Sequence, residues 1–116
     1  MTVPAVQVGL PLTQQDVLDV AFSRRGAALP DEARARVAAG RAYAEELLAE
    51  GAVVYGVTTG FGRFATTRVS AQDAEALQRN LLRSHAVGVG GPLPEELVRA
   101  MLLLRAHSLA LGASGV

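Results

Sequence analysis

The stretch from residue 94 to 111 constrains the fold more than any other part of this sequence. It opens with Pro94, Glu95 and Glu96, a typical helix start, because proline fits the first turn and carboxylates favour the positive end of the helix dipole. Apolar residues then follow around most of the circumference of the expected helix: Leu97, Val98, Met101, Leu102, Leu104, Ala106 and Leu109. Such a helix needs packing partners on several sides. The chain offers few, so we expect the partners beyond Val116 or on another subunit, and we interpret the chain as the front part of a longer protein.

Capping signals divide the rest of the sequence into three further expected helices. Thr13 with Asp16, and Ser70 with Asp73, have the spacing of capping boxes. The helices are expected over about 13–25, 30–50 and 70–86, and Gly51 is a natural stop for the second. Residues 5–10 alternate weakly and predict a short strand, and residues 53–55 predict a brief extended piece. The sequence therefore predicts a mainly α-helical chain with a short N-terminal strand.

The spacing of apolar residues also predicts which faces of the first two helices are buried. The expected stripe of the first helix is Val17, Leu18, Ala21 and Phe22. The expected buried side of the second helix is formed by Val37, Ala38, Tyr43, Ala44, Leu47 and Leu48.

Composition narrows the class of protein. The 116 residues suffice for one small domain and give no hint of two. Eleven basic residues, all arginine, balance eleven acidic ones, so charge gives no argument for binding to nucleic acid or to a membrane surface. Cysteine is absent, which excludes disulfides and thiolate metal sites. With no secretory signal and no apolar run long enough to span a membrane, we expect a cytoplasmic protein.

Two short segments carry the chemistry. Residues 55–62 read Tyr-Gly-Val-Thr-Thr-Gly-Phe-Gly, and Ser84-His85 follows at the end of the next expected helix. A free tyrosine, with a pKa near 10, is a poor base, but beside a cationic or electrophilic centre it can take a proton. Glycines let the backbone approach a ligand closely. Taken alone, Tyr55 also fits a packed strand-end tyrosine, and His85 fits a local hydrogen bond.

Together these segments closely resemble the aromatic amino-acid ammonia-lyase family, and the Ser84-His85 pair looks like its histidine-specific branch. The resemblance is specific from Tyr55 onward and weaker, but compatible, before it. It implies the N-terminal helical domain of the L-aspartase-like fold, with residues 1–116 as a single domain that is incomplete relative to the family. It also implies elimination of ammonia from L-histidine to give urocanate, as part of histidine degradation.

The resemblance implies a role for each matched residue. Tyr55 removes the β-proton of the substrate, and its loop covers the active site through Gly56, Thr59, Gly60, Phe61 and Gly62. His85 contacts the substrate side chain, with Ser84 supporting it. Thr58 departs from the family pattern, because many members have asparagine there. His107 stands without a carboxylate or second histidine at ligand spacing, so we interpret it as structural and expect no metal site.

The family makes its electrophile, 4-methylideneimidazole-5-one (MIO), by cyclising an Ala-Ser-Gly tripeptide. Ala113-Ser114-Gly115 has that composition, but the family's cyclising site follows a Gly/Ser-rich stretch, precedes Asp-Leu and lies further along the chain. Here Gly112 or Gly115 instead resembles a helix C-cap. We therefore expect MIO to form outside this chain, no cofactor within it, no turnover by the chain alone, and a homotetramer at full length.

Two other interpretations stay open. One is a tyrosine or phenylalanine ammonia-lyase, or an aminomutase, of the same family. The other is a non-catalytic truncated domain with a role in assembly.

Overall fold

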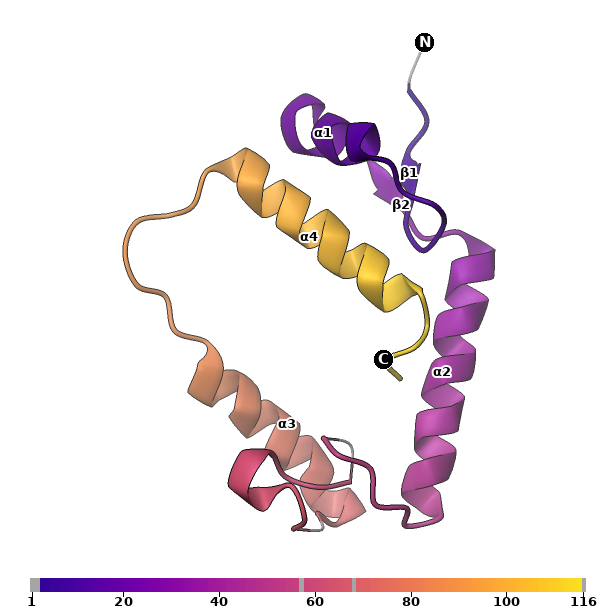
Figure 1. Ribbon diagram of the computed structural model, residues 1–116, viewed down its shortest axis with the longest axis vertical. Coiled ribbons are helices and arrows are strands. Elements are labelled where there is room, and N and C mark those ends of the chain that lie inside the picture. Colours follow the sequence, from indigo (N-terminus) through magenta and orange to yellow (C-terminus); the bar gives the residue numbers. More distant parts are fainter. Residues whose placement is uncertain (1–2, 57, 68, 116) are drawn as a thin grey trace. The chain divides into compact units, whose positions relative to one another are not determined.

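The computed structural model describes residues 3–56, 58–67 and 69–115, and this part of the chain is mainly helical (Figure 1). The elements follow in the order β1 (Val6–Gln7), α1 (Gln14–Ser23), β2 (Ala27–Ala28), α2 (Asp31–Ala49), a 3₁₀ turn η1 (Gly62–Phe64), α3 (Ala71–His85) and α4 (Glu95–Ala110). The predicted fold class is confirmed, including the short strand near the N-terminus. The expected bounds of the helices agree with the observed ones to within about two residues.

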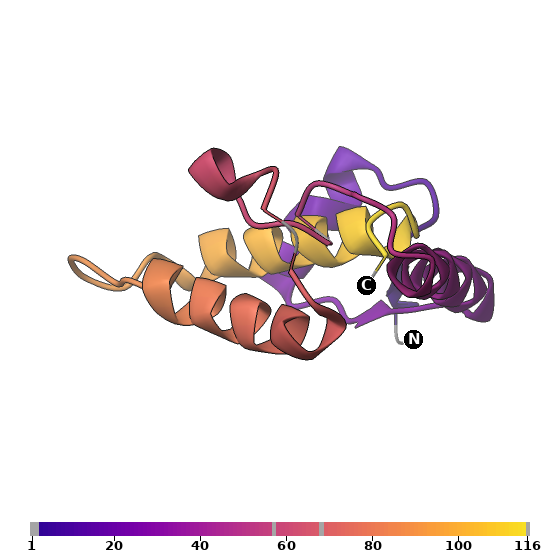
Figure 2. The same cartoon turned by 90° about the horizontal axis from the view of Figure 1, so that it is seen from below.

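The chain forms two compact units, Met1–Ala42 with Gly91–Val116, and Tyr43–Gly90. The boundary falls within α2, which is one continuous helix and is seen almost end-on in Figure 2. Compact units can belong to one domain, so the expectation of a single domain stays a prediction.

The first unit holds the apolar core. Helix α1 packs against α4, and β1 pairs with β2 in parallel, with Val6 opposite Ala27. The backbone N–H of Val6 donates to the Gly26 carbonyl at 2.8 Å, and that of Val8 donates to the Ala28 carbonyl at 2.9 Å. One cluster joins these elements and α2 through the buried side chains of Val6, Val8, Val20, Ala33, Leu103 and Ala110.

Helix α1 begins with the predicted capping box. The Asp16 N–H donates to the Thr13 hydroxyl oxygen at 3.2 Å, and the Thr13 N–H donates to the Asp16 carboxylate at 3.0 Å. The predicted apolar stripe is partly wrong, because Val20 and Ala21 are buried whereas Leu18 and Phe22 are exposed. Successive helix residues are rotated by about 100°, so a face centred between Val20 and Ala21 turns the other two side chains away from α4.

Glycines allow the end of α4 to lie directly on the backbone of α2. Gly112 has a left-handed φ of +78°, and a Cβ built there would lie 2.7 Å from the Arg36 carbonyl oxygen. A Cβ at Gly40 would in turn clash with the carbonyl oxygen of Gly112. Gly112 also closes α4, since its N–H donates to the Leu109 carbonyl at 3.0 Å, as predicted for a C-cap glycine. Gly9, with φ +85°, makes a similar approach to the Ala110 carbonyl.

Most of the apolar side chains predicted on α4 are exposed in the part of the chain that the structure describes. Leu103 and Ala110 are buried. The exposed large side chains of α4 are Leu97, Val98, Met101, Leu102 and Leu104. This agrees with the prediction that the helix has few partners among the described residues.

The second unit consists of the end of α2, a loop and α3. Gly51 ends α2 as predicted, with φ +70° and with the Ala52 N–H donating to the Leu47 carbonyl at 3.0 Å. Ser70 caps α3 by accepting from the Asp73 N–H at 3.1 Å. The extended piece expected at residues 53–55 is instead the start of a tight turn, because the Thr58 N–H bonds back to the Val54 carbonyl at 2.9 Å. No helix in the described ranges is long and apolar enough to cross a bilayer.

Candidate functional site

Two buried threonines hold the glycine loop together. The hydroxyl of Thr58 donates to the Ala52 carbonyl at 2.5 Å and accepts from the Val54 N–H at 2.8 Å. The hydroxyl of Thr59 donates to the Gly60 carbonyl at 3.0 Å and accepts from the Gly56 N–H at 3.3 Å. Thr59 is completely buried. The loop is therefore shaped by its own threonine hydroxyls, and Thr58 fills a position where many members of the resembled family carry asparagine.

Tyr55 and Phe61 form an aromatic pair across the loop. Their ring centroids are 5.9 Å apart and their planes meet at 80°, an edge-to-face arrangement that aromatic rings prefer. Gly56 makes the arrangement possible, because it has φ +74° and a Cβ there would lie 3.1 Å from the ring of Phe61. Tyr55 remains 64% exposed. The loop thus fixes one side of the tyrosine ring and leaves much of the side chain exposed to solvent.

Ser84 and His85 lie in the last turn of α3, as predicted. The Ser84 hydroxyl donates to the Leu81 carbonyl at 3.0 Å. Nδ1 of His85 lies 2.9 Å from the same carbonyl oxygen and 2.9 Å from Oγ of Ser84. Both side chains are exposed, so the outer edge of the imidazole is open.

The predicted residues form two clusters. The loop is joined to the segment that enters α3, because the Val69 N–H donates to the Thr58 carbonyl at 3.0 Å. His85 ends that helix, and 14 residue steps at 1.5 Å place it about 21 Å further along the axis than Ala71. The structure brings Tyr55 together with Gly56 and Phe61, and Ser84 together with His85. Val57 of the loop lies outside the described residues.

Sequence reasoning missed the contact between Tyr55 and Phe61 and the hydrogen bonds of Thr58. The signal for the first was present, since two aromatic residues flank a turn with glycine at position 56. The hydrogen bonds of the threonine had no such signal, because they depend on the path of the loop back toward Ala52.

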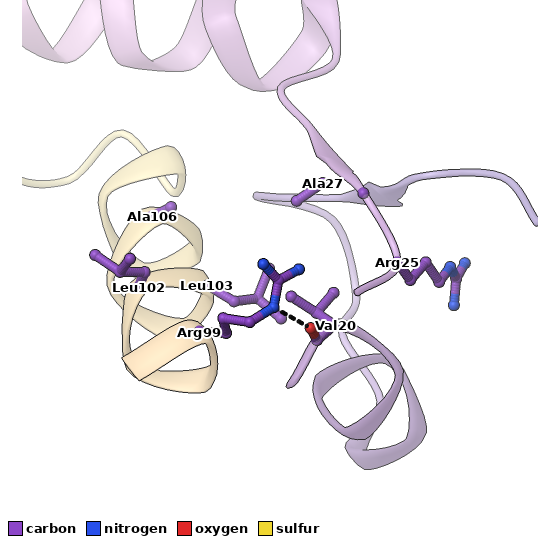
Figure 3. A pocket seen from close by; sticks show the side chains of 8 residues that line it. Val20, Arg25, Ala27, Arg99, Leu102, Leu103 and Ala106 are labelled. Atoms are coloured by element: carbon purple, nitrogen blue, oxygen red, sulfur yellow. Dashed lines mark hydrogen bonds between the residues drawn. The ribbon is translucent and has the colours of Figure 1, made fainter. Parts of the chain in front are cut away.

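An open cavity of about 300 Å³ lies in the first unit, and its described lining includes none of the predicted site residues (Figure 3). Val20, Leu102, Leu103 and Ala106 give it a largely apolar lining, together with Arg25, Gly26, Ala27 and Arg99. The Arg99 Nε–H donates to the Val20 carbonyl at 2.8 Å and so links α4 to α1 beside the cavity. No charged group at this cavity points to catalysis, because the Arg25 guanidinium is paired with Asp16 at 2.7 Å and with Asp19 at 3.2 Å.

His107 has a structural contact, as predicted. Its Nδ1 accepts a hydrogen bond from the backbone N–H of Gly9 at 3.1 Å and so joins α4 to the turn after β1. Within the described part of the chain, no group of three or more histidine, aspartate or glutamate side chains is placed to hold a metal ion.

Comparison with known proteins places this loop and helix in a family. The family model described as "Aromatic amino acid lyase" matches residues 12–116. The chain belongs to the aromatic amino acid lyase family. It is 51% identical over 112 residues to histidine ammonia-lyase of Symbiobacterium thermophilum, a match that covers 97% of the chain and 22% of that enzyme. The resemblance inferred from residues 55–62 and 84–85 is therefore confirmed at the level of the family.

Solved structures of this family share the fold. Tyrosine aminomutase from Streptomyces globisporus matches 98% of the chain and 22% of its own length, with a TM-score of 0.90 and 36% identity. Histidine ammonia-lyase from Trypanosoma cruzi matches the same shares, with a TM-score of 0.84 and 35% identity. The chain thus spans about a fifth of the length of the relatives that it matches.

Proposed function

We propose that this chain is part of a histidine ammonia-lyase, which eliminates ammonia from L-histidine to give urocanate. The observation that carries the proposal is the 51% identity to a histidine ammonia-lyase over nearly the whole chain. The Ser84-His85 pair supports the same choice, because an imidazole can both donate to and accept from the ring of a histidine substrate.

The proposed roles follow the two clusters. Tyr55 takes the β-proton of the substrate, and the loop of Gly56, Thr59, Gly60, Phe61 and Gly62 closes over the reactants and excludes water. His85, supported by Ser84, holds the side chain of the substrate. Tyr55 is exposed in the chain alone, so the positive or electrophilic surroundings that would favour its phenolate belong to other parts of the enzyme.

The MIO group supplies the electrophile that receives the substrate's amino group. The residues present do not fit its formation at Ala113-Ser114-Gly115. That tripeptide directly follows Gly112, which closes α4 and lies against the Arg36 carbonyl, so the segment has the position of a helix C-cap. We therefore propose that MIO forms from a tripeptide elsewhere in the full-length enzyme.

The same proposal includes a homotetramer in the cytoplasm. The exposed apolar side chains of α4 support burial against further protein in the assembled enzyme.

A tyrosine aminomutase is the second candidate. The observation in its favour is the TM-score of 0.90 to the Streptomyces globisporus enzyme. Its identity is lower, 36% against 51%, so we place it second.

A chimera tests the proposed function. We would replace the matching segment of the Symbiobacterium thermophilum enzyme with this chain and follow urocanate formation from L-histidine by ultraviolet absorbance. We expect activity, and a loss of about 100-fold or more in Tyr55→Phe, because general-base catalysis contributes about 10²–10⁴-fold.

Tyr43→Phe is the matched control, since Tyr43 is a similarly exposed tyrosine on α2, outside the loop. Turnover of tyrosine rather than histidine by a soluble, correctly assembled chimera would instead support the aminomutase. Urocanate production by the 116-residue chain alone would place the electrophile at Ser114.

A further inference from the structure

Three polar groups meet at the end of α3. The Leu81 carbonyl oxygen lies 3.0 Å from Oγ of Ser84 and 2.9 Å from Nδ1 of His85, and Oγ and Nδ1 are 2.9 Å apart. A carbonyl oxygen only accepts hydrogen bonds, a hydroxyl both donates and accepts, and a neutral imidazole has one nitrogen of each kind. These rules leave one arrangement in which no two lone pairs face each other.

In that arrangement the Ser84 hydroxyl donates to Leu81, and Nδ1 of His85 must carry a proton. An unprotonated Nδ1 would set its lone pair against that of the Leu81 carbonyl oxygen at 2.9 Å. The Ser84 oxygen still has lone pairs free, so it accepts from the same N–H. We infer that Ser84 and the Leu81 carbonyl hold neutral His85 as its Nδ1–H tautomer, so that Nε2 presents a hydrogen-bond acceptor to the substrate.

The tautomer of His85 follows from the hydrogen bonds alone, but its consequence for the substrate rests on the proposed function. If His85 contacts the substrate, the ring of the substrate must offer a donor to Nε2. The N–H of an imidazole fits this requirement, and so does the O–H of a phenol, but a phenyl ring does not. Ser84 is then a positioning residue, which acts through His85 on the class of ring that the site accepts.

The other histidine is an internal reference. His107 accepts the Gly9 N–H at Nδ1, so its neutral form carries the proton on Nε2. His85 and His107 are the two histidines of this sequence. The chain is thus expected to show one imidazole of each tautomer, side by side in one spectrum.

The test is nitrogen NMR of the chain with ¹⁵N-labelled imidazoles, at about pH 9, where ordinary histidines are neutral. Protonated and unprotonated ring nitrogens resonate far apart, and His107→Gln assigns the two rings. We expect Nδ1–H for His85 and Nε2–H for His107. An Nε2–H form, or an even mixture, at His85 in the unaltered chain would overturn the inference.

Variants then isolate the role of Ser84. Ser84→Ala should lower the share of the Nδ1–H tautomer at His85, and Ser84→Thr should keep it. The control is Ser108→Ala, which removes the serine beside His107 and should leave both rings unchanged. Alanine favours helix, so α3 stays folded, as circular dichroism would verify.

An unaltered His85 spectrum in Ser84→Ala would refute the positioning role. The readout needs no turnover, so failure of this inference and failure of the chimera to make urocanate are separate results.

Discussion

Replacing Gly112 with alanine tests how the end of α4 is joined to α2. The added methyl group would lie 2.7 Å from the carbonyl oxygen of Arg36, 2.8 Å from its carbonyl carbon and 3.0 Å from its Cβ. Two of these atoms are backbone in the middle of a helix, so they cannot move aside as a flexible side chain could. The φ of +78° is a second cost, because it lies in the left-handed region that residues with a Cβ avoid.

The expected loss of stability combines three effects. A left-handed residue with a Cβ costs about 1–2 kcal/mol, and forcing a methyl group into a packed site costs about 1–3 kcal/mol. Against these costs, alanine stabilises the folded state by about 0.4–1 kcal/mol, because it lowers the conformational entropy of the unfolded chain. The net destabilisation is therefore about 3 kcal/mol. With a urea m-value of about 1.5 kcal/mol per molar, the unfolding midpoint should fall by about 2 M.

The assay is urea unfolding of the chain followed by helical circular dichroism. Gly26→Ala is the control in the same unit, since the nearest atom to a Cβ built there is the Ala5 Cβ at 3.9 Å and the φ of Gly26 is not left-handed. Gly51→Ala isolates the backbone effect, because Gly51 has φ +70° and a Cβ built there would meet no atom within 4 Å. We expect almost no change for the first and about 1 kcal/mol for the second. A Gly112→Ala midpoint equal to that of Gly51→Ala would refute the close approach to α2.

Two further predictions concern polar contacts. Thr59→Val removes a fully buried hydroxyl that is hydrogen-bonded to Gly56 and Gly60, so the loop should lose about 1–3 kcal/mol of stability. The loss should appear as faster hydrogen exchange at the Gly56 amide. Thr59→Ser keeps the hydroxyl and should retain the protection of that amide. The pKa of Asp16 is lowered by the hydrogen bond from the Thr13 hydroxyl, then by that from the Thr13 backbone N–H, and by the nearby Arg25. The ionised Asp16 carboxylate therefore stabilises the folded chain above the unfolded pKa of about 3.9, and this contribution is lost as the pH falls through the lower folded pKa. Asp16→Asn should reduce the fall of the melting temperature between neutral and acid pH. A melting temperature that falls with acid as much in Asp16→Asn as in the unaltered chain would contradict this role of Asp16.

Much of the fold followed from local signals in the sequence. Thr13 and Ser70 mark helix starts because a hydroxyl oxygen, only two bonds from Cα, reaches the backbone N–H groups of its own first turn. Gly51 marks a helix end for an equally local reason, its left-handed φ. The buried face of α1 was harder to predict, because Val17, Leu18, Val20, Ala21 and Phe22 are all apolar. Which of them is buried depends on where α4 lies, and α4 is more than 70 residues away.

The candidate site divides in the same way. The Ser84-His85 pair and the Tyr55 loop could be predicted from the sequence, because both are short motifs at a fixed spacing. Their roles in catalysis stay predictions. The ring contact of Phe61 and the double hydrogen bond of Thr58 depend on the path of the loop, which periodicity and capping rules do not determine.

The described side chains that are buried differ in kind between the two units, and the difference bears on the proposed role of the loop. The buried apolar side chains of the described chain, Val6, Val8, Val20, Ala21, Ala33, Leu103 and Ala110, all belong to the first unit. Among the side chains that the structure describes in the second unit, the buried ones are those of Thr58 and Thr59. A segment held by hydroxyl hydrogen bonds opens at lower free energy than an apolar core, because water can replace those bonds. A loop that must admit a substrate and then cover it needs that property. If the loop covers a substrate as proposed, its threonines would give Tyr55 a defined position and would still let the loop open.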